Sequence, residues 1–412
     1  MEFKNVTLGQ ISVGGKGNYG IAAAAVDYDE TLPTYLRITD ISDEGYIITD
    51  SLKSVNESNS EKYKLQINDI VFARTGNSTG KSYFYDGEDG EFIYAGFLIK
   101  FSLDPNKVNP KYIRFYTLSE EYKGWVKGFS TGSTRGNINA QSYANMQIRL
   151  PKREYQDFVV DILSNLENKN KINNKIINNL EQLSRTLFKH WFIDFEFPNE
   201  EGQPYKSNDG EMVESELGAI PKGWSVDSLS SIADIVMGQS PKSDTYNNEN
   251  IGLPLLNGAA DFKKCNLSPN KYTSDAKKIG KKGDFVFGVR ATIGLVTELD
   301  DTYAIGRGAG IAKSLIKEGK EYLYEVLNKA FNEFQYTASG SVYLNISKND
   351  LRDYKICIPS NNVIKRYHLA LRAIMIQKEN LIQENKNLQQ LRDTLLPKIL
   401  SGEIDIPDGL EV

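Results

Sequence analysis

The pattern of apolar residues predicts two long helices. Between Pro151 and Pro198 no glycine or proline interrupts the chain, and apolar residues recur at spacings of three and four. Nine positions from Val159 to Leu187 form a heptad seam that is apolar at seven of them. The same seam recurs 208 residues later, again apolar at seven of nine positions. A rod of roughly 38 residues at ~1.5 Å per residue would be about 57 Å long.

Such a seam is typical of a helix that pairs with another helix. Lys169 and Gln377 stand at the same polar position of the two seams, where a polar residue can set the register of the pair. The alternative is that each helix packs on its own globular domain, although the surrounding faces are rich in Asn, Lys and Gln. The residues expected to pair are Ile176, Leu180, Leu183, Leu187, Leu381, Leu388, Leu391 and Leu395.

An internal repeat accompanies the helices. With the same shift of 208 residues, TGSTRGNINAQSYANMQIRLP (131–151) aligns without a gap to SGSVYLNISKNDLRDYKICIP (339–359). The helical stretches 178–188 and 386–396 also align. A looser match joins residues 67–81 to 282–296, each an Asp, an apolar β-type run, an Arg and Thr/Gly turns, with one extra residue before the second Arg. A period this long indicates a duplicated domain followed by a duplicated helix.

The chain order is therefore globular, helix, globular, helix. The mixture of β-type runs with short helical patterns predicts α+β domains. We expect two similar domains held apart by two long helices in an antiparallel coiled coil with pseudo-two-fold symmetry. The expected segments are domain 1 at 1–151, coiled-coil helix 1 at 152–197, an acidic linker at 198–223, domain 2 at 224–359, and coiled-coil helix 2 with the C-terminal tail at 360–412.

Composition disfavours catalysis. The 412 residues include two cysteines, Cys265 and Cys357, and two histidines, His190 and His368, with no metal-binding or nucleophile motif. No apolar run is long enough to span a membrane and no signal peptide begins the chain, so we expect a protein of the cytoplasm. Residues 15–20, GKGNYG, match the pattern G-x-G-x-x-G, but no amphipathic helix follows them. Residues 75–82 are one residue short of a phosphate-binding loop, and a nucleotide-dependent enzyme is kept as an alternative.

The net charge of −5 hides an uneven distribution. Residues 200–217 contain six acids and one lysine, and sum to −5 by themselves. Residues 263–282 carry seven lysines against Asp275. A basic stretch of this kind is often a solvated face, but it also suits a nucleic-acid phosphate backbone.

Three segments resemble DNA specificity subunits of type I restriction-modification systems. LEQLSRTLFKHWFIDFEFP (180–198) and SELGAIPKGWSVDSLSSIADIVMGQSP (215–241) are similar to the central region of those subunits. LRDTLLPKILSGEI (391–404) looks like their C-terminal end, and the turns before Asn137 and Asn345 resemble the ends of their target-recognition domains. The N-terminal ~65 residues match least.

The resemblance implies a non-catalytic subunit of a bacterial defence system. Each target-recognition domain would read one half of a split site in double-stranded DNA, and the helices would set the spacing. Two methyltransferase subunits and the restriction subunits would bind to it. S-adenosylmethionine, ATP and Mg would belong to those partners, and this chain would hold no cofactor or metal and cross no membrane.

The expected DNA-binding residues are short polar groups and arginines for base edges, and lysines for phosphates. In domain 1 they are Arg74, Asn77, Ser78, Lys81, Ser133, Arg135 and Asn137. In domain 2 they are Lys263, Lys264, Lys277, Lys278, Lys281, Lys282, Arg290, Thr292, Arg307, Ser341, Tyr343 and Asn345. The alternative function is a coiled-coil scaffold that does not bind DNA and whose globular ends bind proteins.

Overall fold

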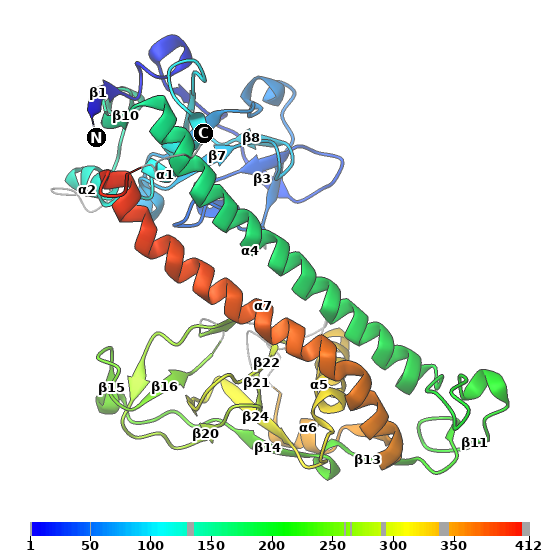
Figure 1. Ribbon diagram of the computed structural model, residues 1–412. Coiled ribbons are helices and arrows are strands. Elements are labelled where there is room, and N and C mark those ends of the chain that lie inside the picture. The colour runs from blue at the N-terminus through cyan, green and yellow to red at the C-terminus, as the bar shows by residue number, and fades with distance from the viewer. Residues whose placement is uncertain are drawn as a thin grey trace. The chain divides into compact units, whose positions relative to one another are not determined.

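A computed structural model describes residues 2–49, 51–129, 136–258, 261–263, 266–289, 294–337 and 346–405 (Figure 1). Of residues 262, 263, 266, 336 and 337 it describes the backbone only. The chain forms two compact units. Unit 1 consists of Met1–Ile172 with Asn385–Val412, and unit 2 consists of Asn173–Glu384. Both units mix helices with sheets, so the predicted α+β class is confirmed.

Unit 1 contains two four-stranded sheets. Their strands are Asn18–Tyr19 (β2), Ala25–Asp27 (β3), Thr34–Leu36 (β4), Lys53–Val55 (β5), Asp69–Ala73 (β6), Ser82–Tyr85 (β7), Phe92–Tyr94 (β8) and Leu98–Ser102 (β9). The first sheet has the order β2-β9-β6-β7 and is antiparallel throughout. The second has the order β3-β5-β4-β8, in which β4 and β8 run parallel. β6 is an unbroken run, DIVFA, buried along its whole length, as expected of a strand covered on both faces.

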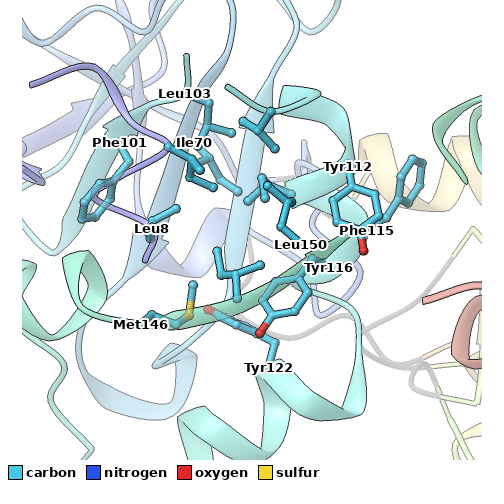
Figure 2. Packing of buried hydrophobic residues seen from close by; sticks show 14 of the residues in the cluster. Leu8, Ile70, Phe101, Leu103, Tyr112, Phe115, Tyr116, Tyr122, Met146 and Leu150 are labelled. Atoms are coloured by element: carbon cyan, nitrogen blue, oxygen red, sulfur yellow. The ribbon is translucent and has the colours of Figure 1, made fainter. Parts of the chain in front are cut away.

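Three short helices complete unit 1: Pro110–Tyr116 (α1), Glu120–Gly128 (α2) and Ala140–Ala144 (α3). Each begins with a side-chain cap, from Asn109, Ser119 and Asn139 respectively. Strands Phe3–Thr7 (β1) and Gln147–Pro151 (β10) then pair antiparallel. Aromatic and aliphatic side chains from these elements form one core, which Figure 2 shows between the strands and helices.

Unit 2 repeats the topology of unit 1. Its main strands are Ser225–Ser228 (β13), Ala233–Met237 (β14), Tyr246–Asn247 (β15), Leu253–Leu256 (β16), Tyr272–Thr273 (β19), Ile279–Gly280 (β20), Phe285–Gly288 (β21), Val296–Glu298 (β22), Tyr303–Ile305 (β23), Ala309–Ser314 (β24) and Lys355–Ile358 (β25). The order β14-β24-β21-β22 matches β2-β9-β6-β7. The order β15-β19-β16-β23 matches β3-β5-β4-β8, including the parallel pair, and adds β20 at one edge. β13 pairs with β25 as β1 pairs with β10.

The segment predicted to be an acidic linker is folded into unit 2. Met212–Val213 (β11) and Ile220–Pro221 (β12) pair antiparallel, and Lys222 lies 2.7 Å from Glu211. The Tyr205 ring stacks on Phe197 with 4.6 Å between ring centroids, and Phe197 stacks in turn on Trp224 at 5.0 Å. Aromatic packing therefore gives this stretch structure despite its negative charge. Unit 2 also contains helices Lys320–Thr337 (α5) and Lys348–Arg352 (α6) and the hairpin strands Phe262–Lys263 (β17) and Asn266–Leu267 (β18).

Both long helices are present. They span Arg153–Phe188 (α4) and Asn361–Ser401 (α7), and α4 ends in a π-helical turn at Lys189–Ile193 (Figure 1). Within unit 2 the two helices contact each other in opposite directions. Asn173 donates to Glu384 at 2.8 Å, Glu181 lies 3.1 Å from Lys378, and the Trp191 ring lies 5.6 Å from the Tyr367 ring.

Within unit 1 the beginning of α4 contacts the end of α7. The Tyr155 hydroxyl donates to the carbonyls of Ile399 and Ile404 at 2.8 and 2.7 Å. Leu395 and Leu396 pack against the core that contains Val159. The last described residues of the chain therefore belong to the same unit as the first.

The buried residues of α4 differ from the predicted seam. After Val159 they are Leu163, Glu167, Asn173, Ile177, Glu181, Ser184 and Phe188. Most of them lie one residue after a predicted seam position. Ile176, Leu180 and Leu187 are half-buried, and Leu183 is 51% exposed. On α7, Leu381, Leu388 and Leu395 are half-buried and Leu391 is 46% exposed. The pairing of these eight residues with one another stays a prediction.

Buried polar contacts attach the globular part of each unit to α4. In unit 1 the Arg114 guanidinium of α1 pairs with the buried Glu167 carboxylate, and the Tyr46 hydroxyl donates to Glu167 at 2.8 Å. In unit 2 the Ser184 hydroxyl donates to Glu325 of α5 at 2.7 Å. A buried polar group needs such a partner, so these contacts select which face of α4 turns inward.

The contact at Glu325 predicts a pH dependence of stability. Burial raises the pKa of the Glu325 carboxyl above its ordinary 4.5. The folded chain therefore binds the proton of the Glu325 carboxyl more tightly than the unfolded chain does. As the pH rises from about 4.5 through the raised pKa, ionisation of Glu325 lowers the free energy of unfolding. Glu325→Gln removes the charge, and we expect the variant to be more stable than the parent at pH 8 and to lose that advantage toward pH 4.

Urea unfolding at a series of pH values measures this effect. Glu214→Gln, at an exposed carboxylate of the same unit, is the matched control and should change the profile little. An equal gain for Glu325→Gln at pH 4 and pH 8 would contradict a titration of Glu325.

Candidate nucleic-acid interface

Arg74 lies at the end of the central strand of unit 1. Its backbone N–H donates to the Phe97 carbonyl at 3.0 Å, and its carbonyl accepts from the Ile138 N–H at 2.9 Å. Its guanidinium carbon lies 5.0 Å from the centre of the Tyr19 ring. Arg74 is half-buried and forms no ion pair with a carboxylate of the described residues. The strand end therefore presents a positioned cation.

Three of the predicted polar residues of unit 1, Asn77, Ser78 and Asn137, lie in segments that connect to this arginine. Asn77 and Ser78 belong to a 3-10 turn, Gly76–Ser78, and Asn137 forms an isolated β-bridge with Thr75. The Thr79 hydroxyl donates to Gly76 at 2.8 Å and to Gly136 at 3.1 Å, which ties the turn to the segment before Asn137. The loop leads into β7 and not into a helix, so it lacks the helix N-terminus of a phosphate-binding loop.

Lys81 differs from Arg74 because it forms an ion pair within the chain. Its ammonium lies 3.0 Å from the Asp43 carboxylate and donates to the Ile41 carbonyl at 3.3 Å. Asp43 is 83% exposed at its side chain, so the pair lies at the surface. The charge of Lys81 is shared within the chain, which weakens its case as a phosphate contact.

Unit 2 has the same backbone hydrogen bonds at the corresponding strand end. Val289 donates to Gly308 at 3.2 Å, and Ile346 donates to Val289 at 3.2 Å. At the start of the strand, Asp284 accepts from the Lys281 N–H at 2.9 Å, as Asp69 accepts from Gln66 at 2.8 Å. Val289 therefore occupies the place of Arg74, and Arg290 follows one residue later. The extra residue between Asp284 and Arg290 causes this shift.

Arg307 lies at the same end of the sheet in unit 2. It is exposed and is followed by Gly308, which accepts from Val289. Its N–H donates to the Ser240 hydroxyl at 3.4 Å, and Ser240 donates to Asn257 at 3.4 Å. Gln239, which precedes Ser240 in the sequence, is also exposed. An exposed arginine, amide and hydroxyl together can present donors and acceptors to base edges.

The four predicted lysines of unit 2 whose side chains are described do not form one cluster. Lys277, Lys278, Lys281 and Lys282 are all exposed, and Lys277 lies 2.8 Å from Asp275. The Lys278 carbonyl accepts from the Ile305 N–H at 2.8 Å. Lys278 therefore lies near the end of the sheet at which Arg307 is found. Lys281 and Lys282 precede β21 and lie at the opposite end of that strand.

Several predicted residues lie outside the described part of the chain. They are Ser133, Arg135, Lys264, Arg290, Thr292, Ser341, Tyr343 and Asn345. Lys263 belongs to β17, with only its backbone described.

Four residues at these strand ends are not among those predicted from the sequence: Tyr19 and Phe97 in unit 1, and Gln239 and Asn257 in unit 2. The sequence contains a second match between the two copies that could have indicated them. In this match Gly20 corresponds to Gly238. Gly20 donates to Leu98 at 3.1 Å, and Gly238 donates to Ala309 at 2.9 Å. These glycines are 218 residues apart, so a comparison at the fixed shift of 208 cannot align them.

Gly20→Ala is expected to disrupt the strand end beside Arg74. A Cβ atom at Gly20 would lie 2.3 Å from the carbonyl oxygens of both Tyr94 and Ala95. Because backbone atoms cannot move aside like a flexible side chain, we expect a loss of about 1–3 kcal/mol in the free energy of unfolding of unit 1. Chemical denaturation measures this loss.

Gly124→Ala is the matched control for that substitution. A Cβ atom at Gly124 in α2 meets nothing within 4 Å, so alanine should leave stability unchanged or raise it slightly. Equal stability of the two variants would show that the backbone beside Gly20 yields easily.

Two further searches cover the rest of the described chain. No group of three or more His, Cys, Asp and Glu residues able to hold a metal ion occurs among the described residues. Within the same residues, neither α4, α7 nor any other helix combines the length and apolar character that a membrane span requires. The groups that gather at strand ends are arginines, amides, hydroxyls and aromatic rings.

The chain contains two copies of one α+β topology, each followed by a long helix, and one family of DNA specificity domains matches it twice. The family of type I restriction modification DNA specificity domains matches residues 2–182 and 221–381. The chain belongs to this family, and its role is DNA recognition.

Individual relatives agree with this assignment. The chain is 28% identical to a Methanocaldococcus jannaschii protein provisionally named the MjaX specificity subunit of a type I restriction enzyme, over 90% of this chain and 87% of the relative. It is 22% identical to the HindI specificity subunit of Haemophilus influenzae, over 83% and 88%. The crystal structure of a type I system S subunit from M. genitalium has the same fold, with a TM-score of 0.54, 13% identity, and coverage of 99% of this chain and 97% of that one.

Proposed function

We propose that each globular domain reads one half of a bipartite site in double-stranded DNA. The observation that carries this proposal is the shared backbone hydrogen-bond pattern at the end of β6 and β21. In both units polar and cationic side chains gather there on a rigid sheet, and arginine and amide groups are the side chains that discriminate base edges. Arg74, Asn77, Ser78 and Asn137 serve domain 1, and Gln239 and Arg307 serve domain 2.

The two helices set the distance between the half-sites in this proposal. α4 and α7 form an antiparallel coiled coil, and the two domains are related by a pseudo-two-fold axis. The opposite direction of the contacts between Asn173 and Glu384 and between Glu181 and Lys378 supports the antiparallel arrangement. Half-sites on one face of DNA lie one helical turn, ~34 Å, apart, and the 36 residues of α4 span about 54 Å.

The chain itself is non-catalytic in this proposal and recruits two methyltransferase subunits and, through them, the restriction subunits. S-adenosylmethionine, ATP and Mg belong to those subunits, and the complex works on chromosomal DNA in the cytoplasm.

Mapping of adenine methylation tests the proposal. The chain is co-expressed with the methyltransferase encoded beside it, and the modified adenines of the host DNA are located. We expect two short blocks separated by a fixed gap. Exchange of residues 225–360 for those of another family member should change one block and keep the other. An active complex that methylates no defined motif would overturn the proposal in favour of a scaffold.

A further inference from the structure

We propose that Tyr19 and Phe97 determine, together with Arg74, which bases domain 1 accepts. Arg74 holds a guanine, and Phe97 packs on the methyl group of a neighbouring thymine. This inference rests on the proposed function, because it names the bases that one of the two strand ends reads.

Phe97 is exposed at the point where domain 1 presents its arginine. Its side chain is 60% exposed, and its carbonyl accepts the Arg74 N–H at 3.0 Å. Leaving a phenylalanine in water forgoes most of the stabilisation that its burial would give. An apolar side chain beside an arginine suits a thymine methyl next to a guanine in the major groove.

Tyr19 is a positioning residue for Arg74. Its ring lies 5.0 Å from the guanidinium carbon, and its hydroxyl accepts the Ala140 N–H at 3.2 Å, so the ring is held at both ends. The Arg74 Nε atom is enclosed and has no hydrogen-bond partner among the described residues. The two terminal nitrogens are therefore the atoms available to donate to guanine O6 and N7.

Unit 2 indicates that this aromatic frame is not needed for folding. The same backbone hydrogen bonds form there with Met237, Val289 and Gly308 in the places of Tyr19, Arg74 and Phe97. Val289 is buried, and neither Met237 nor Gly308 carries an aromatic ring. The aromatic residues of domain 1 therefore serve recognition, and the two domains read their half-sites with different side chains.

Three substitutions test the two roles, with the residues of unit 2 as guides. Phe97→Gly should reduce the thymine preference at one position of one block about tenfold, because it removes the contact to the methyl group. Tyr19→Met should relax the guanine preference in the same block. Tyr19→Phe keeps the ring beside the guanidinium and loses only the contact to the Ala140 N–H, so it should retain most of that preference. Methylation mapping reads both blocks at once, and the second block is the internal control. Unchanged melting temperatures exclude a folding defect.

A duplex with uracil in place of the thymine isolates the methyl group. Loss of this methyl should weaken binding of the parent complex several-fold and leave binding of the Phe97→Gly complex unchanged. Equal weakening of both complexes, or equal loss in both blocks of the motif, would overturn the inference. So would a parent motif that survives all three substitutions, although the proposed function would then stand. If the parent complex shows no bipartite motif, the inference falls together with the proposed function.

Discussion

Replacing Glu167 by alanine is expected to lower the free energy of unfolding of unit 1 by about 3–5 kcal/mol, the cost of breaking a buried ion pair from one side. Glu167 and Arg114 are both buried, and their pairing joins α4 to α1. Without the carboxylate, the guanidinium is left inside the protein beside Tyr46, whose ring centre lies 5.2 Å away. A buried cation without its partner is unfavourable because it has lost its water and gained no equivalent contact.

Chemical denaturation with hydrogen exchange resolved by peptide measures this effect and assigns it to unit 1. Asp161→Ala, at an exposed carboxylate of the same helix, should change stability by less than about 0.5 kcal/mol. The double variant Arg114→Met with Glu167→Leu removes both charges, and should recover most of the loss. A double variant as unstable as Glu167→Ala would show that the loss comes from packing and not from the unpaired charge.

Replacing Tyr367 by alanine should destabilise unit 2 by about 3–5 kcal/mol, the usual cost of deleting a large buried aromatic side chain. Tyr367 is fully buried near the beginning of α7. Its ring centre lies 4.8 Å from that of Phe192 and 5.6 Å from that of Trp191, which follow the end of α4. The cavity would lie where the turn after α4 packs against α7 in unit 2.

Leu369→Ala on the same helix is the control for this substitution. Leu369 is 56% exposed, so its truncation should cost less than about 0.5 kcal/mol. Trp191 and Trp224 belong to the core of unit 2, whereas Trp125 lies in α2 of unit 1. Thermal unfolding followed by tryptophan fluorescence in a Trp125→Phe background therefore reports on unit 2. A small effect of Tyr367→Ala would mean that the neighbouring rings collapse into the space.

The helices and the duplication could be predicted because their signals are local or periodic. An uninterrupted 3–4 spacing specifies a helix at any place in a fold, and α4 and α7 are both present. The repeat at a shift of 208 residues aligned residues 131–151 with 339–359, and within it Ile138 and Ile346 hold equivalent places in the two units.

The register of the recognition residues could not be predicted in the same way. Insertions change the shift between the copies from 208 to 218 near Gly20 and Gly238. One extra residue also separates Asp284 from Arg290. The sequence match therefore paired Arg290 with Arg74, whereas the backbone hydrogen bonds place Val289 at the position of Arg74. Tyr19 and Phe97 carry no motif, and only the sheet brings them to Arg74.

The sequence by itself determined that the chain has two α+β domains and two long helices, and it identified the family through motifs in the centre and at the end. The tertiary structure decided which face of α4 is buried. Glu167 and Ser184 turn inward because their partners, Arg114 and Glu325, come from helices far away in the sequence. A heptad pattern indicates which apolar residues share one face of a helix. The burial of a polar residue depends on a partner that only the folded chain supplies.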